Sequence, residues 1–165
     1  MSNMNSLKTR PIGEISDEHA HRITDFLNNF LANEYALFTK TLNYHWNVTG
    51  PRFHSMHNFL EGHYKTLLNY MDDIAERVRI VGETPYSTLA SLKEAMDVKE
   101  ENGRGMATND MLKDLFDTHI AIQTSIKDII KDEALFKNDP GTEDFLVGML
   151  QGHEEMSWMI KSHLD

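Results

Sequence analysis

Apolar side chains that recur at three- and four-residue intervals along four long segments constrain the fold of this 165-residue chain most strongly. On a helix that spacing gathers them on one face, which has to be buried against other helices. Ser16 is a good N-cap for the first segment, and Gly82 is a good stop for the second. The sequence predicts helices from Ser16 to a break at 49–51, from about 53 to 81, from 108 to about 136 and from about 142 to 164.

The segment between the second and third helices, residues 83–107, has a different character. One proline and two glycines interrupt it, and only 87–96 has the pattern of a short helix. The breaks at 49–51 and 138–141 are short, so the long helices on either side of each break form antiparallel hairpins. The sequence therefore predicts an all-α, ferritin-like four-helix bundle with a short helix in the long crossover between helices 2 and 3.

Composition limits the class of protein. The chain is 40% hydrophobic, carries a net charge of −10 and contains no cysteine, which excludes disulfides and thiolate metal sites. No apolar run is long enough to span a membrane, and no signal peptide is evident in the first 30 residues. The acidic balance argues against a protein that wraps nucleic acid. We expect one cytoplasmic domain over 16–165 behind a flexible tail over 1–15, with no membrane role.

Five potential metal ligands stand at helical spacing in the first two predicted helices: His45, His57, Glu61, Asp72 and Glu76. His57 and Glu61 are four residues apart, as are Asp72 and Glu76, so each pair shares one helix face. His57 and Asp72 are 15 residues apart, roughly 22 Å along a helix axis, whereas metal–ligand bonds are about 2 Å long. An antiparallel second copy brings its Asp72 and Glu76 opposite the first copy's His57 and Glu61. We therefore expect a site shared between two subunits.

A plainer interpretation exists for each of these residues. A single His-x3-Glu or Asp-x3-Glu pair is usually a solvated helix face or an i,i+4 contact, and only the five ligands together favour a metal site. Trp46 is open to two interpretations, an electron donor beside a ligand or a packed aromatic side chain. Trp158 is expected in the core. Several later histidines are expected to be structural or surface groups: His54, His63, His119, His153 and His163.

The segments that carry the ligands resemble the signature of a known family. They read Asn43-Tyr44-His45-Trp46-Asn47-Val48-Thr49-Gly50-Pro51, then Phe53-His54-Ser55-Met56-His57, then Asp72-Asp73-Ile74-Ala75-Glu76-Arg77. Over nearly the whole chain they are similar to the Dps mini-ferritins, proteins of DNA protection during starvation. The resemblance implies a hollow cage, a dodecamer of identical chains, that oxidises Fe(II), preferably with hydrogen peroxide, at di-iron centres and stores the ferric product.

The resemblance also implies how the ligands are divided. His45, His57 and Glu61 come from one subunit, and Asp72 and Glu76 come from its mate across a two-fold axis, in agreement with the spacing argument. Imidazole and carboxylate together suit Fe(II), and carboxylates also stabilise Fe(III). Glu61 stands where many relatives have Asp, and this longer arm bears on the spacing of the two irons.

Two further expectations depend on the acidic character of the chain. Asp139, Glu143 and Asp144 begin the fourth predicted helix, where relatives place acidic three-fold pores that admit iron, although capping and dipole compensation explain them equally well. The alternative function is a cage that protects mainly by binding and compacting DNA, with weak ferroxidase activity. The charge of −10 and a tail with a net charge of only +1 over 1–15 predict that DNA binding is weak or absent.

Overall fold

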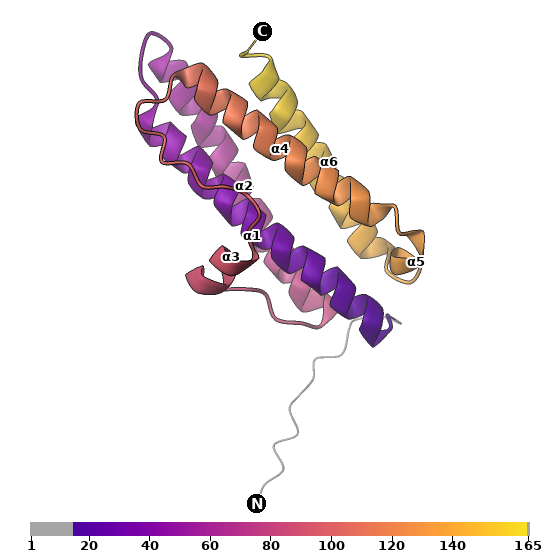
Figure 1. The fold of residues 1–165 in the computed structure, drawn as a ribbon. Helices are drawn as coiled ribbons and strands as arrows, with labels where there is room; N and C mark the ends of the chain where they lie inside the picture. Colours follow the sequence, from indigo (N-terminus) through magenta and orange to yellow (C-terminus); the bar gives the residue numbers. More distant parts are fainter. Residues whose placement is uncertain (1–14, 165) are drawn as a thin grey trace, which may run out of the picture.

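The structure, a computed structural model, describes residues 15–164, and these form helices joined in two antiparallel hairpins (Figure 1). Most of the predicted tail over 1–15 lies outside the described residues. The all-α bundle with a short crossover helix is confirmed. In chain order the helices are α1 (Asp17–Asn47), α2 (Phe53–Val81), α3 (Leu89–Ala95), α4 (Thr108–Ile130), α5 (Glu133–Phe136) and α6 (Pro140–Lys161).

Helices α1 and α2 begin and end where local chemistry predicts. The Ser16 side chain accepts a hydrogen bond from the backbone N–H of His19 at 3.2 Å, so it caps the first turn of α1. Gly82 ends α2 with a φ of 107°, a left-handed conformation that favours glycine. The turn between the two helices is short, and they therefore pack as an antiparallel hairpin (Figure 1).

The crossover carries the predicted short helix, α3, which packs against α1 (Figure 1). Thr88 and Ser91 form a capping box at its start, which explains why so short a segment is helical. Gly103 has a φ of 68°, and a Cβ there would lie 3.1 Å from the Asn43 side chain. The crossover therefore needs glycine where it passes over α1.

The second hairpin differs from the prediction in two places. The expected single helix over 108–136 is wrong, because α4 ends at Ile130 and a separate one-turn helix, α5, follows. Asp132 causes the break: its side chain accepts a hydrogen bond from the Leu135 N–H and so starts a new helix. The last helix begins at Pro140, two residues earlier than expected, because proline suits a first helical turn.

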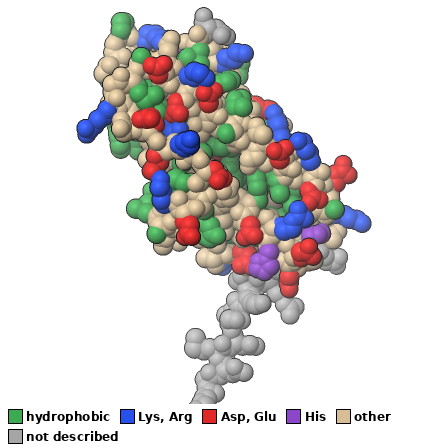
Figure 2. Space-filling view, viewed as in Figure 1, with side chains coloured by type: hydrophobic (Ala, Val, Ile, Leu, Met, Phe, Trp, Pro, Cys, Tyr) green, Lys and Arg blue, Asp and Glu red, His purple; other side chains and the backbone are tan. Residues whose placement is uncertain are grey.

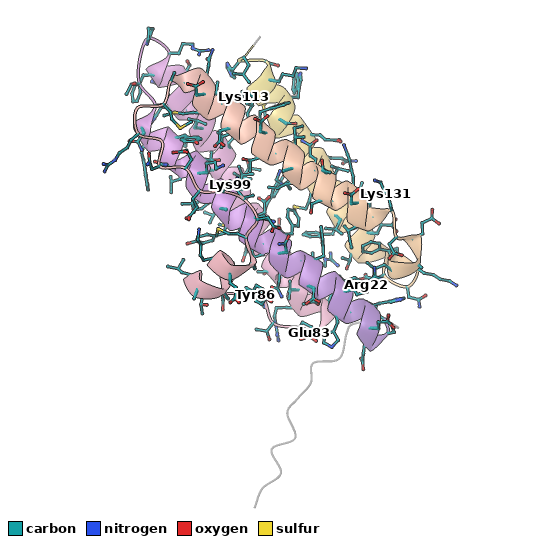
Figure 3. All side chains as sticks on the ribbon, viewed as in Figure 1. Arg22, Glu83, Tyr86, Lys99, Lys113 and Lys131 are labelled. Carbon is teal, nitrogen blue, oxygen red and sulfur yellow. The ribbon has the colours of Figure 1, made fainter. Side chains whose placement is uncertain are left out.

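The core lies between the two hairpins, where side chains from the four long helices fill the space between the ribbons (Figure 3). A polar contact also joins the hairpins: Lys40 Nζ on α1 lies 3.0 Å from Asp114 Oδ2 on α4, and the Tyr44 hydroxyl donates to the same oxygen at 2.6 Å. At one end of the bundle, Arg22 pairs with Asp132 at 2.7 Å (Figure 3). The helices are thus fixed in register at both places.

The prediction that Trp158 lies in the core is wrong for the single chain, since 66% of this residue is exposed. It stands on α6 on the outer side of the helix, away from the stripe of Met149, Met156 and Ile160.

None of the helices over residues 15–164 is both long enough and apolar enough to cross a membrane.

Candidate metal centre

The turn between α1 and α2 brings His45 and His57 face to face. Their imidazole rings stack with centroids 3.7 Å apart and planes 24° apart. Nδ1 of His45 lies 2.8 Å from the backbone carbonyl oxygen of His57, and Nδ1 of His57 lies 2.9 Å from the carbonyl oxygen of His45. We call this reciprocal arrangement the histidine clasp. It places the two predicted ligands together at the α1–α2 corner.

The histidine clasp fixes the tautomer of both rings. A carbonyl oxygen can only accept, so Nδ1 of each ring must be the donor, and in the neutral imidazole Nε2 then carries a free lone pair. Metal-binding histidines are commonly held in this way, with one nitrogen donating to a carbonyl and the other facing the ion. His45 is buried and His57 is half-buried, so the rings have little freedom to turn away.

Glu61 follows His57 by one helical turn on α2. Its Oε1 lies 2.5 Å from Nζ of Lys65, and this hydrogen bond, helped by the charges of His45 and His57, lowers the pKa of the Glu61 carboxyl. Glu61 is therefore a carboxylate at neutral pH. Without a metal its partner is the Lys65 ammonium group, which an incoming cation would have to displace.

Asp72 and Glu76 lie on the same unbroken helix, farther along α2, and both are exposed. The structure therefore does not bring them to His45, His57 and Glu61 within one chain. Among the described residues, no three His, Asp or Glu side chains are arranged so that they can hold a metal ion as they stand. A single chain thus keeps the predicted ligands in two separate groups, and the sharing of ligands between subunits stays a prediction.

Glu76 lines an open groove of about 350 Å³ between α2 and α6, together with Asp73 and Asp144. In the same groove the Arg77 guanidinium lies 5.0 Å from the centre of the Phe145 ring. Asp144 is the predicted pore residue that reaches this groove.

The other two predicted pore residues begin α6 as capping chemistry requires. Asp139 is the N-cap, since its side chain accepts a hydrogen bond from the Thr142 N–H at 3.0 Å, and Glu143 lies in the first turn. Asp139 is thus a helix cap, as its plainer interpretation predicts, and the iron-entry pore stays a prediction.

Trp46 is not packed in the single chain, because 66% of it is exposed. It lines a groove of about 280 Å³ with apolar atoms of Ala36 and Leu42 and with Glu100 and Glu101 of the crossover. Its neighbour His45 points inward to the clasp while Trp46 faces outward. Both interpretations of Trp46 therefore remain predictions. It is either an electron donor beside His45 or an aromatic side chain that packs only when another chain covers it.

A second group of titratable side chains lies in the middle of the bundle, and sequence reasoning missed it as a group. Glu34 on α1, His63 on α2, His119 on α4 and His153 on α6 are all buried, with at most 5% of each exposed. We call these four residues the core cluster. Its three histidines were expected to be structural or surface groups.

Two short contacts link the core cluster. Nδ1 of His119 lies 2.9 Å from Nδ1 of His153, so one ring donates and the other accepts. Nε2 of His153 lies 2.9 Å from Oε1 of Glu34, but the two groups are not aligned for a hydrogen bond. His63 meets His119 edge-on with ring centroids 6.3 Å apart. The cluster thus runs from α1 through α6 and α4 to α2.

Several atoms of the core cluster have no hydrogen-bond partner. They are both oxygens of Glu34, both ring nitrogens of His63, and Nε2 of His119 and of His153. Burial lowers the pKa of His63 to about 4, and burial together with His153 and His63 holds the pKa of His119 well below its ordinary value. His63 and His119 are therefore neutral imidazoles at pH 7.

A signal for the core cluster was present in the sequence. Glu34 follows Leu27, Phe30 and Leu31 at core spacing on α1, and each histidine falls on the corresponding apolar stripe of its helix. Polar residues at the core positions of four helices are costly unless they pair, so the pattern predicts that they meet.

The surface bears on the alternative of DNA binding. Over the face drawn in Figure 2, basic and acidic side chains are interspersed, and neither kind forms a continuous patch there.

Comparison with known proteins agrees with this architecture. The ferritin-like domain family matches residues 24–165. A low temperature-induced protein of Nostoc sp. is 34% identical over 151 residues, which cover 92% of this chain and 84% of that protein. A DNA protection during starvation protein of Brevibacillus brevis is 32% identical over 84% of this chain and 92% of its own length. The solved structure of Dps from Staphylococcus aureus is 32% identical, with a TM-score of 0.82 over 88% of this chain and 96% of that chain.

Proposed function

Because this chain belongs to the ferritin-like family, among the Dps proteins, we propose that it is a mini-ferritin that oxidises Fe(II) and stores ferric iron. Its substrates are Fe(II) and, preferably, hydrogen peroxide. We further propose that the sites form where two chains meet across a two-fold axis, that twelve chains make a hollow cage, and that the cage works in the cytoplasm. The acidic net charge of −10 supports weak or absent DNA binding.

The proposed ligands divide into two half-sites. His45, His57 and Glu61 bind iron from one chain, and Asp72 and Glu76 complete the site from the mate. The observation that carries this proposal is the histidine clasp, because it leaves the Nε2 lone pair of each ring free to bind a metal. Glu61 lies one turn beyond His57 and is a carboxylate at neutral pH.

The reaction balances with two irons and one peroxide. Each Fe(II) loses one electron, the O–O bond of the peroxide breaks, and two protons from solvent join the oxygens to give two waters. Because both electrons are delivered together, no hydroxyl radical is released. The carboxylates of Glu61, Asp72 and Glu76 stabilise the more highly charged Fe(III) products, and the imidazoles of His45 and His57 position the Fe(II) substrates. Paired oxidation is the step that protects the cell.

The first test is iron oxidation by a variant without the clasp. Fe(II) is added anaerobically to the wild type and to His45→Ala/His57→Ala, a peroxide pulse follows, and ferric absorbance is recorded after assembly has been checked by size. We expect rapid oxidation by the wild type and only the protein-free rate in the variant. His54→Ala is the matched control, because His54 is an exposed histidine on the same helix. Equal rates in wild type and double variant would rule out this site.

A second test asks whether the ligands are shared. His45→Ala/His57→Ala chains are mixed with Asp72→Asn/Glu76→Gln chains, unfolded and reassembled together. In a random mixture about a quarter of the shared sites regain all five ligands, because only one of the two sites in each mixed dimer is intact. We expect ferroxidase activity to return to about that fraction. No recovery in cages of normal size would mean that the site does not cross the interface.

A further inference from the structure

The core cluster carries a second inference, which is independent of the proposed function. Glu34, His63, His119 and His153 bring one polar residue from each long helix to the middle of the bundle, and several of their atoms are buried without a partner. Unpaired polar atoms in a protein interior call for an explanation such as a bound ion. We propose that His63, His119 and His153 bind one divalent transition-metal ion such as Zn²⁺ in the bundle core, with Glu34 as the carboxylate that orients His153.

The separations of His119 from His153 and from His63 support one shared ion. Metal–nitrogen bonds of about 2.0–2.1 Å and tetrahedral angles put the centroids of ligating imidazoles roughly 5 Å apart. The ring centroids of His119 and His153 are 5.2 Å apart, and those of His63 and His119 are 6.3 Å apart. To reach the separation of ligating rings, His63 has to approach His119 by about 1 Å. Its two ring nitrogens have no hydrogen bond that holds it back.

The contact between His119 and His153 marks where the ion belongs. Their Nδ1 atoms are 2.9 Å apart, so a single proton now lies between two lone pairs that point toward each other. A metal ion can replace this proton, since two nitrogens bound to one ion need only move apart slightly. His119 is a neutral imidazole, the form that binds metals.

Glu34 supplies the support that such a site requires. In metal sites, the second nitrogen of a ligating histidine usually faces a carboxylate, which sets the ring orientation and raises its basicity. Glu34 Oε1 lies 2.9 Å from Nε2 of His153, on the side of the ring away from His119. The Lys40 ammonium group, which is buried on the same helix, is paired with Asp114 instead. A cation in the cluster would therefore be the positive charge nearest to the Glu34 carboxyl group.

The donor set selects the class of metal. Three imidazoles suit Zn²⁺ and Co²⁺, whereas Mg²⁺ and Ca²⁺ prefer oxygen ligands. Because the cluster is enclosed, an ion held there exchanges slowly and ties all four long helices together. Its role is structural.

The test uses Co²⁺, whose visible absorption is strong in tetrahedral sites. The assembled His45→Ala/His57→Ala variant serves as the background, so that the clasp cannot bind the probe. It is incubated with Co²⁺ at length, passed over a chelating resin, and analysed for absorption and bound cobalt. We expect about one tetrahedral Co²⁺ per chain, with the three histidines and one water molecule as ligands, and we expect Zn²⁺ to displace it. His119→Gln in this background should abolish the absorption, and Glu34→Gln should weaken binding about 10–100-fold.

Ser157→Ala is the matched control, because Ser157 is buried beside the cluster and bonds to Gln123 rather than to a histidine. This variant should bind Co²⁺ like the background. No retained tetrahedral cobalt in the background, or absorption unchanged by His119→Gln, would overturn the proposal. Should His119→Gln fail to assemble, X-ray absorption of the loaded background decides, since a shell of oxygens without imidazole would equally overturn it. Iron oxidation plays no part in the readout, so the proposed ferroxidase stands or falls separately.

Discussion

The histidine clasp and the core cluster use the same kinds of side chain in opposite surroundings. The clasp lies at a corner, where the rings of His45 and His57 are held by backbone carbonyls and Glu61 is partly open to solvent. The core cluster is closed off, and in it the rings of His119 and His153 contact each other while Nε2 of His153 lies 2.9 Å from Glu34. An ion at the clasp would exchange readily with solvent, whereas an ion in the enclosed core cluster would exchange only slowly. Exposure, more than residue type, therefore separates a site suited to turnover from one suited to stability.

The largest effect that would test this contrast is on stability. His153→Ala leaves a cavity in the core and leaves Nδ1 of His119 buried without its partner, which should lower the free energy of unfolding by about 3–5 kcal/mol. His57→Ala loses one hydrogen bond at a half-buried position and should cost about 1 kcal/mol. Urea midpoints at one protein concentration measure both. Equal urea midpoints for His153→Ala and His57→Ala would mean that the core cluster contributes no more to stability than the clasp.

Gly152 gives a second test within the core, with a matched control on the same helix. A Cβ at Gly152 would lie 1.9 Å from the Tyr70 hydroxyl oxygen, whereas a Cβ at Gly148 meets nothing within 4 Å. Tyr70 packs beside His153, so its ring cannot easily move. Gly152→Ala should destabilise by about 1–3 kcal/mol, and Gly148→Ala should be neutral or stabilise by up to about 1 kcal/mol.

Tyr70→Phe checks the cause of the Gly152 effect. It removes the hydroxyl that the new Cβ meets, so it should restore part of the thermal midpoint lost in Gly152→Ala. A midpoint that Tyr70→Phe does not change would assign the loss to another contact.

The pH dependence of stability is a smaller effect. His119 is buried and its pKa is well below the ordinary value of 6.5, so the unfolded chain binds a proton on this residue that the folded chain excludes. Above pH 6.5 His119 is neutral in both states, so its burial does not lower the free energy of unfolding. As the pH falls from 6.5 toward the folded-state pKa of His119, the free energy of unfolding decreases. Over the first pH unit below 6.5, the free energy of unfolding should fall by about 1 kcal/mol. Urea midpoints between pH 8 and 5 measure it, and His119→Gln should reduce the slope.

The smallest effect concerns Lys65 at the clasp. Lys65→Met removes the ammonium group that lowers the pKa of Glu61 and that occupies its carboxylate. Because the ion pair is exposed, metal affinity at neutral pH should rise by less than about fivefold. Anaerobic Fe(II) titration of both proteins measures this, with Lys113→Met, which breaks the i,i+4 pair with Asp117, as the control. A weaker affinity in Lys65→Met would show that Lys65 assists metal binding.

Sequence alone predicted those parts of the fold that depend on local chemistry. The Ser16 cap, the Gly82 stop and the spacing of apolar residues set α1 and α2 correctly, because each signal acts within a few residues. The break after α4 was missed, since Asp132 stands in an otherwise helical pattern and only its capping bond reveals the new start. The exposure of Trp158 was missed because sequence spacing alone does not show which side of a helix is left open in the single chain.

The candidate site was predictable in its members more than in its geometry. Spacing identified His57 and Glu61 as neighbours on one helix, but the reciprocal bonds of the clasp depend on how the turn folds. The core cluster was missed because its members lie on four different helices, and no spacing within one helix connects them. Glu34 at a core position was the informative residue, since a carboxylate there needs a partner.

The histidine clasp makes the connection between α1 and α2 part of the proposed metal centre. The ring of each histidine is bonded to the backbone carbonyl of the other. The length of the five-residue connection between Asn47 and Phe53 therefore helps to set the distance between the Nε2 lone pairs of His45 and His57. An insertion in the crossover would change a surface loop, but an insertion of one residue in this turn would change the coordination geometry. The length of the α1–α2 turn thus sets the coordination geometry, and changing it by design is a way to change which metal the two histidines bind.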